Sequence, residues 1–240
     1  MSYIYDILDD NDKKMVTCAF NGRIELLRCY IARYVFSFSL DIGRMDSPMQ
    51  LIYIHGFNSD AQSVKGQMLT DWCASNRPEI QVVRPDLNLP PLQVMDKLSK
   101  LIANDPNTGL VGSSLGGYFA TACVAKFGIK AVLVNPTVVP FERFQRFFSA
   151  GQQGHTTPGG WTLTKSDIVD LESLYLPIPR YPDQLLVLLK EGDEVLDYRV
   201  AEAHYSQAGA QSPMIVESGG DHFMHDMATK IPLMIDFLFG

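Results

Sequence analysis

From Met49 onward, short apolar runs alternate with longer segments of mixed hydrophobic and polar character. Apolar runs bounded by turn residues predict buried strands, at about 51–54, 80–84, 109–111, 131–134, 185–189 and 214–216. The segments between them predict helices, at about 61–75, 91–103, 118–127, 198–207 and 231–239. Strands that alternate with helices predict an α/β fold, with a mostly parallel central sheet flanked by helices and ligands bound at the carboxyl ends of the strands.

Residues 1–48 have a different pattern. The apolar segments 15–20 and 23–27 flank Asn21-Gly22, a pair of residues typical of a two-residue hairpin turn. Between residues 36 and 42, apolar side chains alternate with polar ones, as in a half-buried strand. We therefore expect residues 1–48 to be a leader that contributes edge strands at most.

One segment interrupts the strand–helix pattern of the main domain, 49–240. Residues 137–183 show no strand pattern and are rich in aromatic residues, among them Phe141, Phe144, Phe147, Phe148, Trp161 and Tyr175. A long aromatic insertion fits a lid or the wall of a substrate pocket. It fits equally well a helical excursion whose aromatic residues only pack on the sheet, and the sequence leaves both interpretations open.

The segment Gly112-Ser113-Ser114-Leu115-Gly116 matches the pattern G-x-S-x-G between a predicted strand and a predicted helix. In that setting the central serine occupies a sharp turn, and its Oγ is exposed beyond the sheet as a nucleophile. The pattern also arises by chance, and the alternative is a glycine-rich turn in which Ser114 caps the helix. The nucleophile hypothesis therefore depends on finding a base, an orienting acid and an oxyanion hole.

Histidine is the side chain best suited to take a proton from a serine at neutral pH. His222 follows a glycine-rich loop after the last predicted strand, so we assign it as the base. His225 is expected to begin the final helix, and His55 to fix the loop that follows the first strand. His155 is expected on the surface of the insertion, and His204 to be a solvated or capping side chain.

The orienting acid is expected directly after a strand that lies between serine and histidine in the chain. Asp193 is the first aspartate after the strand at 185–189. Glu194 is expected to point elsewhere, and Asp197 to cap the next helix. The resulting chain order of serine, acid and histidine is the one found in α/β hydrolases.

An oxyanion hole needs two N–H donors aimed at the position where negative charge develops. Leu115 follows the nucleophile, and Phe57 follows His55-Gly56 after the first strand, so their backbone N–H groups are the candidates. Phe144 and Phe148 of the insertion are candidates for the wall that receives the acyl chain. A small domain leaves little room for a long groove, which favours short to medium chains.

Composition and charge limit the kinds of partner and the location that we expect for the protein. The net charge of −7 without a Lys/Arg cluster argues against nucleic acid or an anionic membrane as a partner. The four cysteines have no metal-ligand spacing, which indicates reduced thiols and no metal site. Acidic residues near the start are the opposite of a signal peptide, and charges interrupt the apolar stretch 24–42. We expect a cytoplasmic protein that acts on a small-molecule ester, and the oligomeric state stays open.

Several separated motifs together resemble a known family. They are Tyr53-Ile54-His55-Gly56-Phe57-Asn58-Ser59, Ser63 with Lys65, the serine motif extended to Gly117-Tyr118, Asn135-Pro136, Gly192-Asp193-Glu194-Val195-Leu196-Asp197-Tyr198 and Gly219-Gly220-Asp221-His222. In order and spacing they resemble the small bacterial YqiA-type esterases of the α/β-hydrolase superfamily, over about 49–240. The resemblance implies an α/β-hydrolase fold and hydrolysis of carboxylic esters without a cofactor. It also implies Ser114, Asp193 and His222 as the catalytic triad.

Two other functions remain open. An acyl thioesterase would use the same residues on a better leaving group. A non-catalytic binding protein with this fold would keep Ser114 without using it, but such a protein needs neither the acid nor the base.

Overall fold

The computed structural model describes residues 3–8, 14–19, 49–105, 107–149 and 154–240. The chain divides into two compact units, Met1–Ser47 and Pro48–Gly240. In the first unit, β1 (Tyr3–Leu8) pairs antiparallel with β2 (Lys14–Ala19) as a separate two-stranded sheet. β2 lies close to the strand predicted at 15–20, but its partner β1 is not among the predicted strands. The predicted turn at Asn21-Gly22 and the strand at 36–42 lie outside the described residues.

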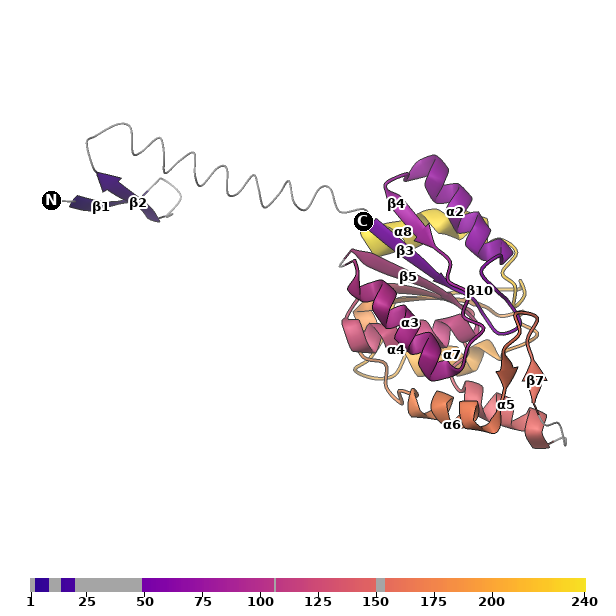
Figure 1. The fold of residues 1–240 in the computed structure, drawn as a ribbon. Helices are drawn as coiled ribbons and strands as arrows, with labels where there is room; N and C mark the ends of the chain where they lie inside the picture. Colours follow the sequence, from indigo (N-terminus) through magenta and orange to yellow (C-terminus); the bar gives the residue numbers. More distant parts are fainter. Residues whose placement is uncertain (1–2, 9–13, 20–48, 106, 150–153) are drawn as a thin grey trace. The chain divides into compact units, whose positions relative to one another are not determined.

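The second unit is built on a six-stranded sheet in the order β10-β9-β6-β5-β3-β4 (Figure 1). Every pairing in this sheet is parallel, in agreement with the α/β prediction. The strands are β3 (Met49–Ile54), β4 (Ile80–Val83), β5 (Thr108–Ser113), β6 (Ala131–Val134), β9 (Leu185–Lys190) and β10 (Met214–Glu217).

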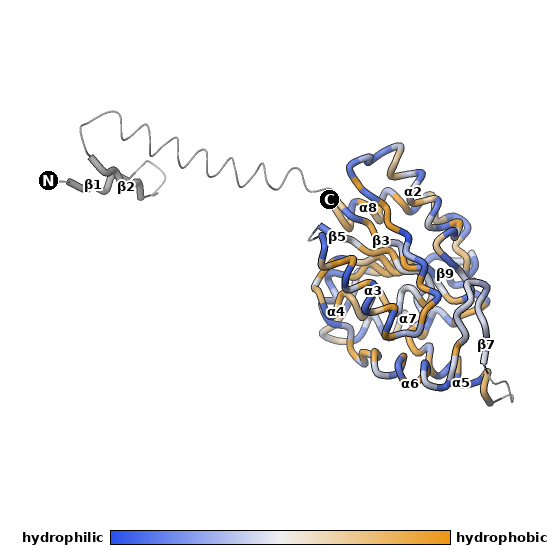
Figure 2. The backbone as a smooth tube through the Cα atoms, viewed as in Figure 1, coloured by the Kyte–Doolittle hydropathy of each residue, from blue (hydrophilic) through white to orange (hydrophobic). Residues whose placement is uncertain are grey.

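Helices cover both faces of the sheet (Figure 1). One hydrophobic core joins the sheet to α2 (Val64–Asn76) and α8 (Met227–Phe239). The other lies beneath α3 (Pro91–Ala103), α4 (Leu115–Phe127) and α7 (Tyr198–Tyr205). Because both faces of the inner strands β3, β5, β6 and β9 are largely buried, the sequence shows continuous apolar runs there, and these form the hydrophobic centre of the second unit in Figure 2.

The strand order indicates where a ligand site is expected, namely beyond the carboxyl ends of the neighbouring strands β3 and β5. β4 lies on one side of β3 and β5 on the other, so the connections change direction at β3 and β5. Ile54 pairs with Gly112, and Ser113 pairs with Val134, so the ends of β3, β5 and β6 lie at one level. The crevice beyond the carboxyl ends of strands at such a point is the usual ligand site of an open α/β sheet.

The insertion between β6 and β9 is partly different from the prediction. It forms α5 (Pro140–Ser149), a hairpin of β7 (His155–Thr156) and β8 (Thr162–Leu163), α6 (Lys165–Ser173) and a 3₁₀ turn (Pro182–Gln184). The prediction of an insertion without strands was therefore wrong for β7 and β8. Strands of two residues are too short to show an alternating pattern.

Candidate active site

Ser114 lies on a strained turn between β5 and α4. Its φ of +54° and ψ of −119° fall in a region that non-glycine residues rarely occupy. The turn is fixed by its backbone, because the Ser114 N–H donates to the Val134 carbonyl at 3.0 Å. Ser114 is the residue that precedes α4, but its side chain makes no capping hydrogen bond. The capping alternative is therefore excluded, and Oγ is available for another partner.

Glycine is required where this turn meets the neighbouring strand. A Cβ placed on Gly116 would lie 2.0 Å from the carbonyl oxygen of Ile54. A Cβ on Gly112 would lie 2.4 Å from the carbonyl oxygen of Gly116. Both distances are far inside van der Waals contact with backbone atoms, so the two glycines of the motif allow α4 to begin directly against β3.

The structure brings Ser114, His222 and Asp193 together from three separate loops. His222 Nε2 lies 3.1 Å from Ser114 Oγ, and His222 Nδ1 lies 2.7 Å from Asp193 Oδ2. A carboxylate only accepts hydrogen bonds, so Nδ1 carries the proton and Nε2 is free to accept one from the serine. This geometry is the one that a serine nucleophile, a histidine base and an orienting acid require.

The Asp193 carboxylate is buried and fully bonded. Its side chain is 2% exposed, and Oδ1 accepts from the N–H groups of Val195 at 2.9 Å and Leu196 at 2.7 Å. Asp197 has the role predicted for it, because it precedes α7 and accepts from the Arg199 N–H at 3.1 Å. Asp193, rather than Asp197, is thus the carboxylate placed on the histidine.

Two polar side chains, Asn135 and Glu194, hold the loop of His222, a role that the sequence analysis gave to neither. Asn135, 2% exposed, donates through Nδ2 to the carbonyls of Asp221 at 3.1 Å and His222 at 3.2 Å. Its Oδ1 accepts from the Lys190 N–H at 2.9 Å, which ties this loop to β9. The expectation that Glu194 points elsewhere was wrong, since its Oε2 accepts from the His222 N–H at 3.0 Å. The available signal for Asn135 was its position directly after a buried strand, at the edge of the sheet where the ligand site is expected.

A buried lysine at the end of β9 forms ion pairs next to the same loop. Lys190 Nζ, at the end of β9, lies 2.6 Å from both Glu217 Oε2 and Asp226 Oδ2. Burial opposes its charge, but the hydrogen bonds to Asp226 and Glu217 outweigh burial and raise the pKa of Lys190. Its aliphatic stem fills the space beside Gly220, where an added Cβ would lie 2.6 Å from Lys190 Cδ. The ion pairs therefore connect β9, β10 and the start of α8 around the histidine loop.

The two segments that carry the expected oxyanion donors lie beside Ser114. Leu115 is the first residue of α4, where a backbone N–H has no acceptor within the helix. Phe57 follows Gly56, and a Cβ placed on Gly56 would lie 3.1 Å from Ser114 Cβ and 3.7 Å from Ser114 Oγ. The loop after β3 thus approaches the serine as closely as its glycine allows.

His55 fixes this loop, as predicted. Its Nε2 accepts from the Leu87 N–H at 2.9 Å, so the proton lies on Nδ1, which donates to the Gly56 carbonyl at 2.9 Å. Burial lowers the pKa of His55, which keeps the ring neutral.

Two of the remaining histidines, His204 and His225, depart from their predictions. His204 is buried, its ring packs edge-on against Tyr205, and burial lowers its pKa, so the prediction of a solvated or capping side chain was wrong. His225 precedes α8, which begins at Met227, and it bonds to Asp221 instead of starting the helix. His155 is half-buried against Phe147, with Nε2 2.8 Å from Asn58 Oδ1.

Aromatic residues of the insertion pack against the loop after β3. Phe144 is 4% exposed, and its ring centroid lies 4.7 Å from that of Phe57. Trp161 packs perpendicular to Phe57, with ring centroids 5.8 Å apart, while Phe148 is half-buried against the same core. The insertion therefore contacts the residue whose N–H is a candidate oxyanion donor.

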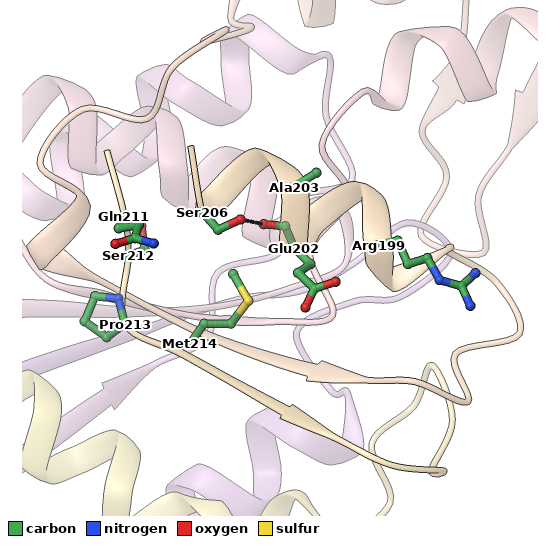
Figure 3. A pocket seen from close by; sticks show the side chains of 8 residues that line it. All are labelled: Arg199, Glu202, Ala203, Ser206, Gln211, Ser212, Pro213 and Met214. Carbon is green, nitrogen blue, oxygen red and sulfur yellow. Dashed lines mark hydrogen bonds between the residues drawn. The ribbon is translucent and has the colours of Figure 1, made fainter. Parts of the chain in front are cut away.

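Two grooves have none of Ser114, Asp193 and His222 in their lining. One, of about 320 Å³, lies between α5 and the loop that follows Asp193. Its lining includes Thr137, Arg143, Arg146 and Leu196. The other, of about 870 Å³, runs between α7 and the start of the edge strand β10 (Figure 3). Its lining mixes charged side chains such as Arg199 and Glu202 with apolar ones such as Met214, and it includes none of Ser114, Asp193 and His222.

Within the described part of the chain, no cluster of three or more histidine, cysteine or acidic side chains could hold a metal ion. The same residues include no helix that is both long and apolar enough to cross a membrane.

Comparisons with known proteins agree on the fold. The model of a family described as "Uncharacterised protein family (UPF0227)" matches residues 50–239. Among solved structures, alpha/beta hydrolase domain-containing protein 10 from mouse is 17% identical, with a TM-score of 0.58 over 78% of this chain and 89% of its own. A putative hydrolase from Agrobacterium vitis is 15% identical (TM-score 0.61, 80% and 87%). Est1E from Butyrivibrio proteoclasticus is 13% identical (TM-score 0.60, 81% and 90%). At these identities the structures show an α/β-hydrolase fold.

Proposed function

The chain belongs to the uncharacterised protein family UPF0227, and on this premise we propose that it is a serine esterase that cleaves carboxylic esters through an acyl-enzyme at Ser114. The family match confirms the resemblance to YqiA-type esterases as a family assignment. The observation that carries the proposal is the continuous chain of contacts from Ser114 Oγ to His222 and on to Asp193. This arrangement supports acyl transfer, because the reaction needs a nucleophile, a base and an orienting acid in contact in this order.

In the proposed reaction, Ser114 Oγ attacks the ester carbonyl while His222 Nε2 takes the serine proton. Negative charge develops on the carbonyl oxygen and is stabilised by the N–H groups of Phe57 and Leu115. Asp193 stabilises the imidazolium. The alcohol leaves with the proton from His222, and the acyl group stays on Oγ. Water, activated by the same histidine, then releases the carboxylic acid and restores the serine.

Short to medium acyl chains are the proposed substrates, with Phe144 and Phe148 as part of the acyl wall. The packing of Phe144 on Phe57 supports this placement, because it brings the insertion to the loop that carries the oxyanion donor. Phe148→Ala should change the preference among p-nitrophenyl esters of graded chain length more than it changes kcat on the acetate. Equal losses on all esters would show that Phe148 only packs. Acyl-CoAs in the same panel test the thioesterase alternative.

Labelling with a fluorophosphonate probe tests the nucleophile. Wild type should be labelled and Ser114→Ala should not, while Ser113→Ala, a change of the same size one residue earlier, should keep the label. Peptide mapping of the adduct identifies the modified residue. A folded wild type that takes no label would support the binding-protein alternative, and a label at Ser113 would move the nucleophile.

We also propose that residues 49–240 are the catalytic unit and that the leader 1–48 is not needed for chemistry. The match of the family model to residues 50–239 supports this division. Every group with a proposed role in catalysis lies in the same range.

A further inference from the structure

Lys65 is a buried cation that the triad chemistry does not use. It lies in the first turn of α2, is 7% exposed, and donates from Nζ to Ser113 Oγ at 2.8 Å. The same Nζ lies 4.9 Å from the centroid of the Phe223 ring, within the range of a cation–π interaction. Among the described residues, no carboxylate lies within ion-pair distance of Lys65.

The two contacts of Lys65 join the two sides of the triad. Ser113 immediately precedes Ser114, and Phe223 immediately follows His222. One ammonium group therefore contacts the turn that carries the nucleophile and the loop that carries the base. These segments lie more than a hundred positions apart in the chain, and no backbone hydrogen bond is recorded between them in the described parts of the chain.

We propose that Lys65 is a positioning residue of the active site, whose ammonium sets the distance between Ser114 and His222 through Ser113 and Phe223. This inference rests on the proposed function. Stability alone does not explain such a residue, because a buried cation without a carboxylate partner is costly. Replacing a buried charged group with an apolar side chain of similar volume is often neutral or stabilising.

Burial, and not the surrounding charge, brings the pKa of Lys65 into the range of an activity assay. Burial lowers the pKa of Lys65 to about 8, and the negative charges of Asp193 and Asp221 act in the opposite direction. Burial raises the pKa of Tyr53, which bonds to Ser113, to about 12, so this phenol stays neutral over the same range. Other titratable or charged groups on the surrounding elements have partners of their own: His222 in the triad, His225 on Asp221, Arg84 on Gln67 and Lys230 on Glu217.

Lys65→Met tests the inference, because methionine keeps an unbranched apolar stem but removes the ammonium. Lys126→Met is the matched control. Lys126 also donates to a serine hydroxyl, at 3.0 Å from Ser99 Oγ, and lies 5.1 Å from the centroid of Phe127, but it is exposed and far along α4 from Ser114. Hydrolysis of p-nitrophenyl acetate is measured from about pH 6 to pH 9.5, with Ser114→Ala as the blank for background hydrolysis.

Wild type should lose kcat above about pH 8, as Lys65 loses its proton. Lys65→Met should unfold in urea at no lower concentration than wild type, lower kcat about tenfold because the reacting groups are displaced, and lack the alkaline decline. Lys126→Met should behave as wild type. A folded Lys65→Met with normal kcat and the wild-type pH profile would overturn the inference.

If Lys65→Met does not fold, the variant Phe223→Leu tests the positioning role of Lys65 instead. Phe223 is 37% exposed, so the substitution is tolerable, and loss of the ring should move the alkaline decline to lower pH. An unmoved decline would overturn the inference. Fluorophosphonate labelling separates this outcome from failure of the proposed function: a labelled wild type with an ordinary Lys65→Met refutes only the positioning role, whereas an unlabelled wild type refutes both.

Discussion

Substitution of Asn135 should damage stability and catalysis together, and the structure sets the size of the first effect. Asn135→Ala removes two hydrogen bonds to the carbonyls of Asp221 and His222 and leaves the buried Lys190 N–H without its acceptor. Hydrogen bonds contribute about 1 kcal/mol each, and an unsatisfied buried group costs about 1–3 kcal/mol. Asn135 also has a φ of +41°, which costs alanine roughly 1 kcal/mol more than glycine. The hydrogen-bond terms alone give an expected loss of about 3–5 kcal/mol in the free energy of unfolding, and the backbone term adds to this loss.

Two further substitutions separate the causes. Asn135→Gly relieves the backbone strain, so it should be about 1 kcal/mol more stable than Asn135→Ala. Asn135→Asp keeps an oxygen for the Lys190 N–H but places carboxylate oxygen against the carbonyls of Asp221 and His222. The aspartate variant should therefore lose kcat at least as strongly as the alanine variant, because the histidine loop is repelled.

Urea unfolding followed by circular dichroism measures the stabilities, and hydrolysis of p-nitrophenyl acetate at temperatures where each variant is folded measures kcat. An Asn135→Ala variant within about 1 kcal/mol of wild type, with unchanged kcat, would refute the reasoning. It would show that the side chain does not restrain the His222 loop.

Three other predictions concern the acid, two glycines and a buried histidine. Asp193→Asn should lower kcat on the order of 10³–10⁴-fold by removing the partner of the histidine. Asp197→Asn should change kcat little, because asparagine also caps helices. Kinetics at saturating ester measure both, and a larger loss for Asp197→Asn would contradict the assignment of Asp193 as the acid. Gly116→Ala should prevent correct folding, because its Cβ would lie 2.0 Å from a backbone oxygen. Gly128→Ala meets no atom within 4 Å but has a φ of +67°, so it should lower the free energy of unfolding in urea by only about 1–2 kcal/mol. Burial lowers the pKa of His204 below its ordinary value of 6.5, so the unfolded chain binds more protons below that pH and stability should fall as pH is lowered from about 7.5 to 5.5. His204→Phe should reduce this dependence, and an unchanged dependence would contradict it.

The parts of the fold that were predicted correctly are those set by local pattern. The helix predicted at 91–103 is observed as Pro91–Ala103, because proline is favoured at the first helical position and an apolar stripe follows it. The strand at 131–134 is observed at the same residues, since a short apolar run ends at Asn135-Pro136. The geometry of Ser114, Asp193 and His222 follows from the sheet, because residues after parallel strands meet at one edge.

Contacts between distant segments could not be predicted in the same way. The side chain of Asn135 reaches a carbonyl 87 positions away, and that of Lys65 reaches a hydroxyl 48 positions away. A polar residue after a strand indicates only the edge at which it lies, and a lysine near the start of a helix usually indicates a solvated face. His204 was misjudged for the same reason, since its burial against Tyr205 comes from tertiary packing and not from its place in the helix.

These long-range contacts share a physical feature that connects them to function. Asn135, Lys190 and Lys65 are polar side chains at most 7% exposed, and each contacts a segment next to a residue of the proposed triad. Apolar residues of similar size at such positions would avoid the desolvation penalty, but they cannot fix the direction of a neighbouring carbonyl or hydroxyl. Directional bonds matter here because catalysis needs reacting atoms to be held within a fraction of an ångström, which packing alone specifies less sharply. Substitution of Lys65 should therefore lower activity without lowering stability, because its ammonium has no carboxylate partner among the described residues. Substitution of Lys190 should lower both, because its ion pairs stabilise the fold and also hold the loop of His222.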